Sequence, residues 1–183
     1  MPRLMHARPA DRFDPWKLAA SGERVEGSVP LAQLGRLTDL LRETGGDVRY
    51  RLRGEVDAEG RKFLSVDISA DVVLACQRCF GPLLLPLHCT VALAPVASEA
   101  QAAQVPEHYE PVLAGEEGIA ISEVIEDELL LALPLVAMHE NLRECEANGF
   151  ALPKTGAEPV AAKEEPQPFA ALAALLKKSR DQE

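Results

Sequence analysis

Hydrophobic and polar residues alternate one by one over residues 48–56, where arginines and a glutamate separate the apolar positions. A period of two predicts a β-strand with one buried face. Residues 57–60, Asp-Ala-Glu-Gly, then have the composition of a hairpin turn. The alternation resumes over residues 63–68. The two stretches therefore predict an antiparallel hairpin.

Further strands are predicted on both sides of this hairpin. The second strand continues into the apolar residues 72–75, and a third apolar run covers residues 83–94. Pro86 lies inside the third run and predicts a bulge or an edge position, because proline has no N–H to donate to a ladder. Residues 24–29 alternate weakly and predict a short strand before the hairpin.

Two segments have helical periodicity instead. Leucines recur at helical spacing over residues 31–43. Pro30 is suited to the first turn of such a helix, and Gly45-Gly46 is suited to its C-terminal end. Residues 121–133 have apolar side chains every four positions, acidic residues near the start, and Pro134 directly after the end. We expect both helices to cover the sheet.

The expected architecture is an α+β domain over residues 1–150, in which an antiparallel sheet packs against two helices. Within it, residues 95–118 predict a long loop anchored by Tyr109 and Val112, and Trp16 is expected to anchor the N-terminal arm. Residues 151–183 read as a flexible linker followed by a short amphipathic helix over 168–178.

The charge distribution narrows the range of functions. Residues 1–62 hold 12 Lys+Arg against 10 acidic residues, whereas residues 63–149 hold 2 against 14. An acidic chain is a poor direct ligand for nucleic acid, and eight aromatic residues offer little base stacking. We expect any RNA contact to use the N-terminal third or another protein. No segment has the roughly 20 apolar residues of a membrane span, so we expect a cytoplasmic protein without a membrane partner.

Arg49, Arg51 and Arg53 alternate with apolar residues and are predicted to lie on one face of their strand. Such a row is typical of a solvated sheet face. It would equally serve as a basic stripe for phosphate groups or for an acidic protein.

Four residues have the spacing of metal ligands. Cys76 and Cys79 form a Cys-x2-Cys pair, and His139 and Cys145 follow just beyond the acidic helix. Together they fit the Cys3His pattern of a closed structural zinc site, so zinc is the expected cofactor. Unliganded thiols and a redox pair are the alternatives, although the redox motif would normally begin a helix. Cys89 is expected in the core.

The sequence has no recognisable catalytic constellation. It contains neither a glycine-rich phosphate loop nor a Gly-x-Ser-x-Gly elbow, and His139-Glu140 lacks the second histidine of a metalloprotease helix. Residues 126–128, Glu-Asp-Glu, are adjacent on a helix and point in different directions, so we expect them to be solvated or to cap a helix, with an acidic surface for a partner as the alternative. We therefore expect a non-enzymatic protein with no small-molecule substrate.

The order of several motifs resembles the YceD family, the large ribosomal RNA subunit accumulation proteins. The motifs are Cys76-Gln77-Arg78-Cys79, Pro106 to Pro111, Val124 to Pro134, His139 with Cys145, and Pro168-Phe169-Ala170-Ala171-Leu172. The resemblance implies a ribosome biogenesis factor that acts in synthesis, processing or stability of 23S rRNA. It also implies ribosomal precursor particles, assembly proteins or 23S rRNA itself as partners. The alternative is a zinc-stabilised protein-interaction or regulatory module with no link to rRNA.

Overall fold

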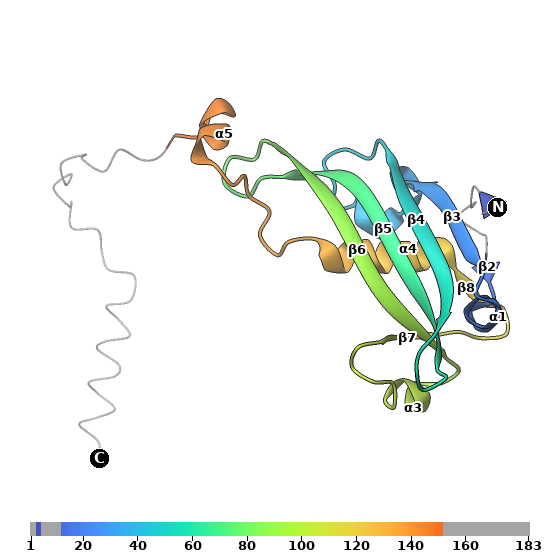
Figure 1. The fold of residues 1–183 in the computed structure, drawn as a ribbon. Coiled ribbons are helices and arrows are strands. Elements are labelled where there is room, and N and C mark those ends of the chain that lie inside the picture. The colour runs from blue at the N-terminus through green and yellow to red at the C-terminus, as the bar shows by residue number, and fades with distance from the viewer. Residues whose placement is uncertain (1–2, 5–11, 152–183) are drawn as a thin grey trace, which may run out of the picture. The chain divides into compact units, whose positions relative to one another are not determined.

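The computed structural model describes residues 3–4 and 12–151, and the chain divides into two compact units, Met1–Phe150 and Ala151–Glu183. Within the described residues, six strands form the main sheet in the order β1-β3-β4-β5-β6-β7 (Figure 1). These strands are β1 (Arg3–Leu4), β3 (Arg24–Pro30), β4 (Asp47–Val56), β5 (Lys62–Ala75), β6 (Pro82–Val96) and β7 (Glu110–Leu113). The short strands β2 (Arg12–Phe13) and β8 (Ile119–Ala120) pair with each other.

The centre of the sheet is the antiparallel meander that the alternating pattern predicts. The predicted hairpin is confirmed, since β4 pairs with β5 in the register Arg49↔Ser69 through Val56↔Lys62. On its two sides, β3 pairs antiparallel with β4 and β6 pairs antiparallel with β5. Residues of even number from Val48 to Gly54 are buried and those of odd number up to Arg53 are exposed, as a period of two requires, whereas Val56 at the end of β4 is exposed.

The edges of the sheet differ from the purely antiparallel prediction. β1 runs parallel to β3, and β7 runs parallel to β6. Both pairings join short segments through long connections, which no local pattern reveals. β7 covers β6 only from Leu93 to Val96, so Pro86 lies where β6 has β5 alone as a neighbour. The edge position predicted for Pro86 is confirmed.

Helix α4 (Ile121–Ala132) crosses one face of the sheet, and no helix in the described part of the chain covers the opposite, open face (Figure 1). The expectation of two helices is wrong in number, because the described residues form five α-helices. They are α1 (Pro15–Ser21), α2 (Gly35–Thr38), α3 (Glu99–Ala102), α4 (Ile121–Ala132) and α5 (Leu142–Ala147). α4 begins as predicted and ends one residue early. Its side chains at 121, 124, 125 and 129 are buried in the core with the inward residues of β4, β5 and β6.

The helix predicted over residues 31–43 is much shorter in the structure. A 3₁₀ turn (Leu31–Gln33) leads into the single turn of α2. The backbone N–H of Arg42 instead donates to the carbonyl of Val73 on β5, and this contact competes with a longer helix. Gly35, the first residue of α2, is also a weak helix former.

The Glu126 carboxylate of α4 caps α2. Its Oε1 accepts the backbone N–H of Leu37 at 3.1 Å, and its Oε2 accepts Nε of Arg36 at 2.9 Å. Leu34, at the N-cap position of α2, has no side-chain acceptor to offer. Glu126 is therefore buried instead of solvated, and it acts as a cap for a different helix.

The long segment before α4 holds α3, β7 and β8. The anchoring role predicted for Tyr109 is confirmed, because its ring is buried against Phe63 and its hydroxyl donates to Asp57 at 2.8 Å. The anchoring role predicted for Trp16 is wrong, since this side chain on α1 is 38% exposed and Leu18 is buried in its place. The predicted linker and helix over 152–183 lie outside the described residues. No helix in the described part of the chain has the length and apolar character needed to cross a membrane.

Candidate metal centre

The first two candidate ligands lie in the tight turn between β5 and β6. Cys76 follows β5 directly, and its carbonyl accepts the N–H of Phe80 at 2.8 Å while its own N–H donates to Gly81 at 2.9 Å. Phe80 has a φ of 57°, which closes the turn. The Gly81 N–H also lies 3.4 Å from the Cys79 sulfur. The turn therefore directs both sulfurs to the same side.

The other two candidate ligands come from the segment after α4. His139 precedes α5, and Cys145 lies within α5, at the end of the sheet where β5 turns into β6 (Figure 1). The Gln77 N–H donates to the Ala137 carbonyl at 2.7 Å and fixes this segment against the turn. Cys76, His139 and Cys145 are buried, and Cys79 is half-buried.

The four ligand atoms face one another. Cys76 Sγ lies 3.9 Å from Cys145 Sγ, and His139 Nδ1 lies 3.5 Å from Cys79 Sγ and 3.6 Å from Cys145 Sγ. All four atoms lie within 4.8 Å of one another. In a tetrahedral zinc site with ordinary bond lengths, ligand atoms are about 3.8 Å apart for two sulfurs and about 3.6 Å apart for sulfur and nitrogen. The cluster has nearly these spacings.

The orientation of His139 is fixed by its second nitrogen. Nε2 lies 3.0 Å from the carbonyl oxygen of Pro82, which accepts a proton and cannot donate one. Nε2 therefore carries the proton, and Nδ1 presents its lone pair to the cysteines. A hydrogen bond that fixes the ring in this way is typical of histidines that bind metals.

The surroundings favour negative charge at one sulfur. Burial opposes ionisation of Cys76, but hydrogen bonds from the backbone N–H groups of Cys79, His139 and Arg78 outweigh it and lower the pKa of Cys76 to about 5. Burial and the nearby sulfurs of Cys79 and Cys76 raise the pKa of Cys145 to about 11. A soft cation would stabilise every sulfur as a thiolate, since metal binding displaces the protons.

Arg78 contributes to the site in a way that the spacing alone did not indicate. Its Nη1 lies 3.7 Å from Cys145 Sγ, and its Nη2 lies 3.9 Å from Met138 Sδ. If a divalent cation were bound, three thiolates and a neutral histidine around it would carry one net negative charge, which the Arg78 guanidinium would balance. The sequence did contain a signal for this role, because Arg78 lies between the two cysteines of the Cys-x2-Cys turn.

The remaining cysteine and histidines of the described chain lie elsewhere. Cys89 packs against the core, as expected, with its sulfur 3.8 Å from the carbonyl of Glu128. His88 is exposed on β6, and the His108 ring contacts Tyr109. The structure thus brings together the four residues chosen by spacing and leaves these three outside.

Residues 64–176 match the protein family described as large ribosomal RNA subunit accumulation protein YceD. The curated protein of that name from Haemophilus influenzae is 36% identical over 166 residues, which cover 90% of this chain and 94% of the relative. The chain belongs to the YceD family. The resemblance drawn from the motifs is therefore confirmed, and with it, at the level of the family, a role in accumulation of the large ribosomal RNA.

The matched region of the YceD family includes the Cys3His cluster and all of α4. It begins at residue 64, within β5, whereas the alignment with the relative extends over most of the chain. No solved structure matches the chain.

Proposed function

We propose that this protein is a ribosome biogenesis factor that promotes synthesis, processing or stability of 23S rRNA. Membership of the YceD family carries the proposal, because the relative from Haemophilus influenzae is named for accumulation of large-subunit ribosomal RNA. The partners would be precursor particles of the large subunit, their assembly proteins or 23S rRNA itself. The site of action would be the cytoplasm, where large subunits are assembled.

Depletion in cells tests this function. We expect fewer large subunits on a sucrose gradient and less mature 23S rRNA relative to 16S rRNA, and the wild-type gene should restore both. Fractions from the same gradient should contain the protein among precursor particles. Normal large-subunit levels after depletion would contradict the proposal. Co-purification with an unrelated complex would favour an interaction module outside rRNA metabolism.

We propose further that the protein acts by binding and not by catalysis. The ligand atoms of the Cys3His cluster face one another and are largely buried, which supports a structural role over thiol chemistry on a substrate. A disulfide-reduction assay checks this point. Turnover by the full chain that disappears in Cys76→Ser would show that the cysteines are catalytic.

The Cys3His cluster is proposed to be a structural zinc site. Cys76, Cys79, His139 and Cys145 would hold the ion, with the charge balanced by Arg78. The ion would join the β5–β6 turn to the segment around α5, which lies more than 60 residues away in sequence. Structural zinc binding is worth about 10–16 kcal/mol in small zinc domains, so its loss should unfold this end of the sheet.

The chain offers a matched control for the zinc site. We expect one zinc per chain by elemental analysis, and a lower melting temperature after chelation or in Cys79→Ser. Cys89→Ser should retain the metal, because Cys89 lies outside the cluster. Well under one zinc per chain in protein purified without chelator would contradict the proposal, as would equal melting of the two variants.

A further inference from the structure

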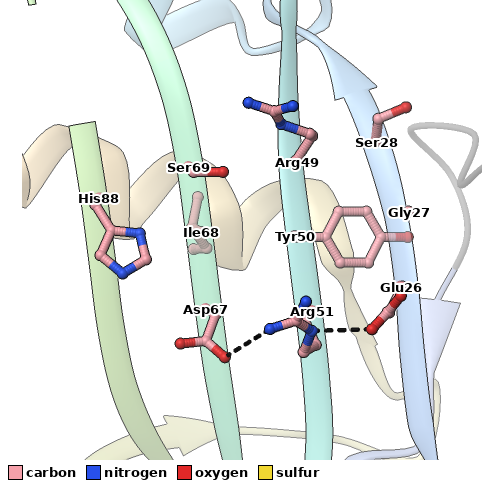
Figure 2. Close-up of a pocket in the computed structure, with 10 residues that line it drawn as sticks. All are labelled: Glu26, Gly27, Ser28, Arg49, Tyr50, Arg51, Asp67, Ile68, Ser69 and His88. Atoms are coloured by element: carbon pink, nitrogen blue, oxygen red, sulfur yellow. Dashed lines mark hydrogen bonds and ion pairs between the residues drawn. The ribbon is translucent and has the colours of Figure 1, made fainter. Parts of the chain in front are cut away.

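The open face of the sheet has a row of hydrogen-bond donors that crosses four strands. Ser28 on β3 is paired with Arg49 on β4, Arg49 with Ser69 on β5, and Ser69 with His88 on β6. Figure 2 shows the four side chains in this order across the sheet. Four strands span about 14 Å at the usual spacing of 4.8 Å. We call these four residues the donor row.

The donor row has no partners among the described residues. Among the described residues, none of the four side chains makes a hydrogen bond or an ion pair, and Arg49 and His88 are exposed. A guanidinium has five donors and no acceptor, and a hydroxyl can donate wherever an acceptor lies. The row therefore presents unused donors to any ligand on this face.

The next row along the strands has its charges already paired. Arg51 donates to Glu26 at 2.9 Å and lies 3.9 Å from Asp67, which accepts the hydroxyl of Thr90 at 3.1 Å. Figure 2 shows the ion pairs of Arg51 on both sides. These internal pairs leave Arg49 as the cation that is free to bind an anion in this part of the groove.

The donor row lines a groove of about 640 Å³, whose other lining residues include Gly27, Tyr50 and Ile68. Tyr50 is the aromatic residue among them and is buried. Apart from the small imidazole of His88, this groove exposes no aromatic ring, so it suits the phosphate groups of a polynucleotide better than its bases, which need stacking surfaces.

We propose that the donor row binds the phosphate backbone of RNA, with Arg49 as its main contact. The inference rests on the proposed function, which links the protein to 23S rRNA. Arginine binds phosphate through two parallel hydrogen bonds, and serine hydroxyls complete such sites. Binding is sequence-independent and weak, because one cation faces the ligand in a chain with a net charge of −10.

Arg53 supplies a matched control. It lies on the same strand and face as Arg49, two positions beyond Arg51, and its side chain is 63% exposed beside Glu55. Both Arg→Gln variants remove one charge from a solvated position, and equal melting temperatures would show that both fold. Only Arg49→Gln removes a residue of the donor row.

The first measurement is fluorescence anisotropy of the full chain with a labelled, mixed-sequence, single-stranded RNA of about 20 nucleotides. We expect Arg49→Gln to weaken binding about five- to tenfold and to lower the slope of log K against log salt by about one. Arg49→Lys should keep part of the affinity, and Arg53→Gln should change it less than twofold. Equal losses in the two Gln variants, or no binding by the wild type, would overturn the proposal. A polyglutamate peptide that binds more tightly than RNA at this groove would point to an acidic protein and also overturn it.

The second measurement separates this inference from the proposed function. In cells that lack the protein, the wild-type gene and Arg53→Gln should restore 23S rRNA levels, and Arg49→Gln should not. Full restoration by Arg49→Gln would overturn the role of the groove and leave the biogenesis function standing. Failure of the wild-type gene would instead contradict the biogenesis function.

Discussion

Replacing Glu126 with alanine would remove the connection between α4 and α2. Its carboxylate is 8% exposed and accepts both the Leu37 backbone N–H and the Arg36 side chain. Leu37 is fully buried, so its N–H would have no acceptor in the variant. Glutamine keeps an oxygen at the same position and is the matched comparison.

The magnitude follows from these two contacts. A buried N–H left without a partner costs about 1–3 kcal/mol. The ion pair contributes no more than about 1 kcal/mol, because the Arg36 side chain is 56% exposed and solvent screens it. Arg36 also keeps a contact with Asp127 at 2.7 Å. Glu126→Ala should therefore lose about 1–4 kcal/mol of unfolding free energy, and Glu126→Gln less than Glu126→Ala, about 1 kcal/mol at most.

Urea unfolding of the full chain, followed by circular dichroism at a fixed zinc concentration, measures the difference. With a slope of about 2 kcal/mol/M, the midpoint of Glu126→Ala should fall by roughly 0.5–2 M and that of Glu126→Gln by less, under about 0.5 M. A double-mutant cycle with Arg36→Ala isolates the ion pair. If both variants at Glu126 lose the same stability, or neither loses any, the capping role is wrong.

Three other predictions rest on single features of the structure. Gly54→Ala should be strongly destabilising in thermal unfolding, because a Cβ at Gly54 would lie 2.0 Å from the carbonyl oxygen of Leu18. Leu129→Ala should cost about 2–5 kcal/mol in urea unfolding because Leu129 is fully buried, whereas Leu131→Ala, at a side chain 77% exposed, should cost under about 0.5 kcal/mol. For Asp57, burial raises the pKa, but hydrogen bonds from backbone N–H groups of the turn and from a tyrosine hydroxyl outweigh it, so the pKa falls below its usual 3.8. When the folded state has a lower pKa than the unfolded state, ionisation stabilises the folded protein at pH values above the unfolded pKa, and this stabilisation is lost as the pH falls through the folded pKa. Asp57→Asn should therefore have a lower melting temperature than wild type near neutral pH, and the difference in melting temperature should shrink in acid. A gap that stays constant with pH would contradict the role of the Asp57 charge.

Much of the fold could be predicted from the sequence because its patterns are local. The alternation that begins at Val48 matches the burial of β4 as far as Gly54, and the apolar stripe of α4 predicts that helix to within one residue. The shortening of the helix predicted over residues 31–43 could not be predicted in the same way. Its first turn is capped by Glu126, which is 89 residues away from Leu37, and the chain after it bonds to β5. The parallel edge strands also depend on distant partners.

The same difference between local patterns and distant contacts applies to the candidate metal site. Residue type and spacing identified Cys76, Cys79, His139 and Cys145 as ligands, since thiolates and imidazole are the groups that zinc prefers. Their approach in space depends on the backbone contact between residues 77 and 137, which no spacing rule gives. Of the donor row, the sequence indicated only Arg49, as part of a basic stripe. The other three members lie on other strands, and they align with Arg49 only through the register of strand pairing.

The short reach of β7 leaves most of one side of β6 without a neighbouring strand. An exposed strand edge of this kind can pair with an extended segment of another molecule. Pro82 and Pro86 both lie in this stretch and withhold two amide hydrogens from such an addition. The prolines that interrupt an otherwise apolar strand thus oppose its pairing with a strand of another chain.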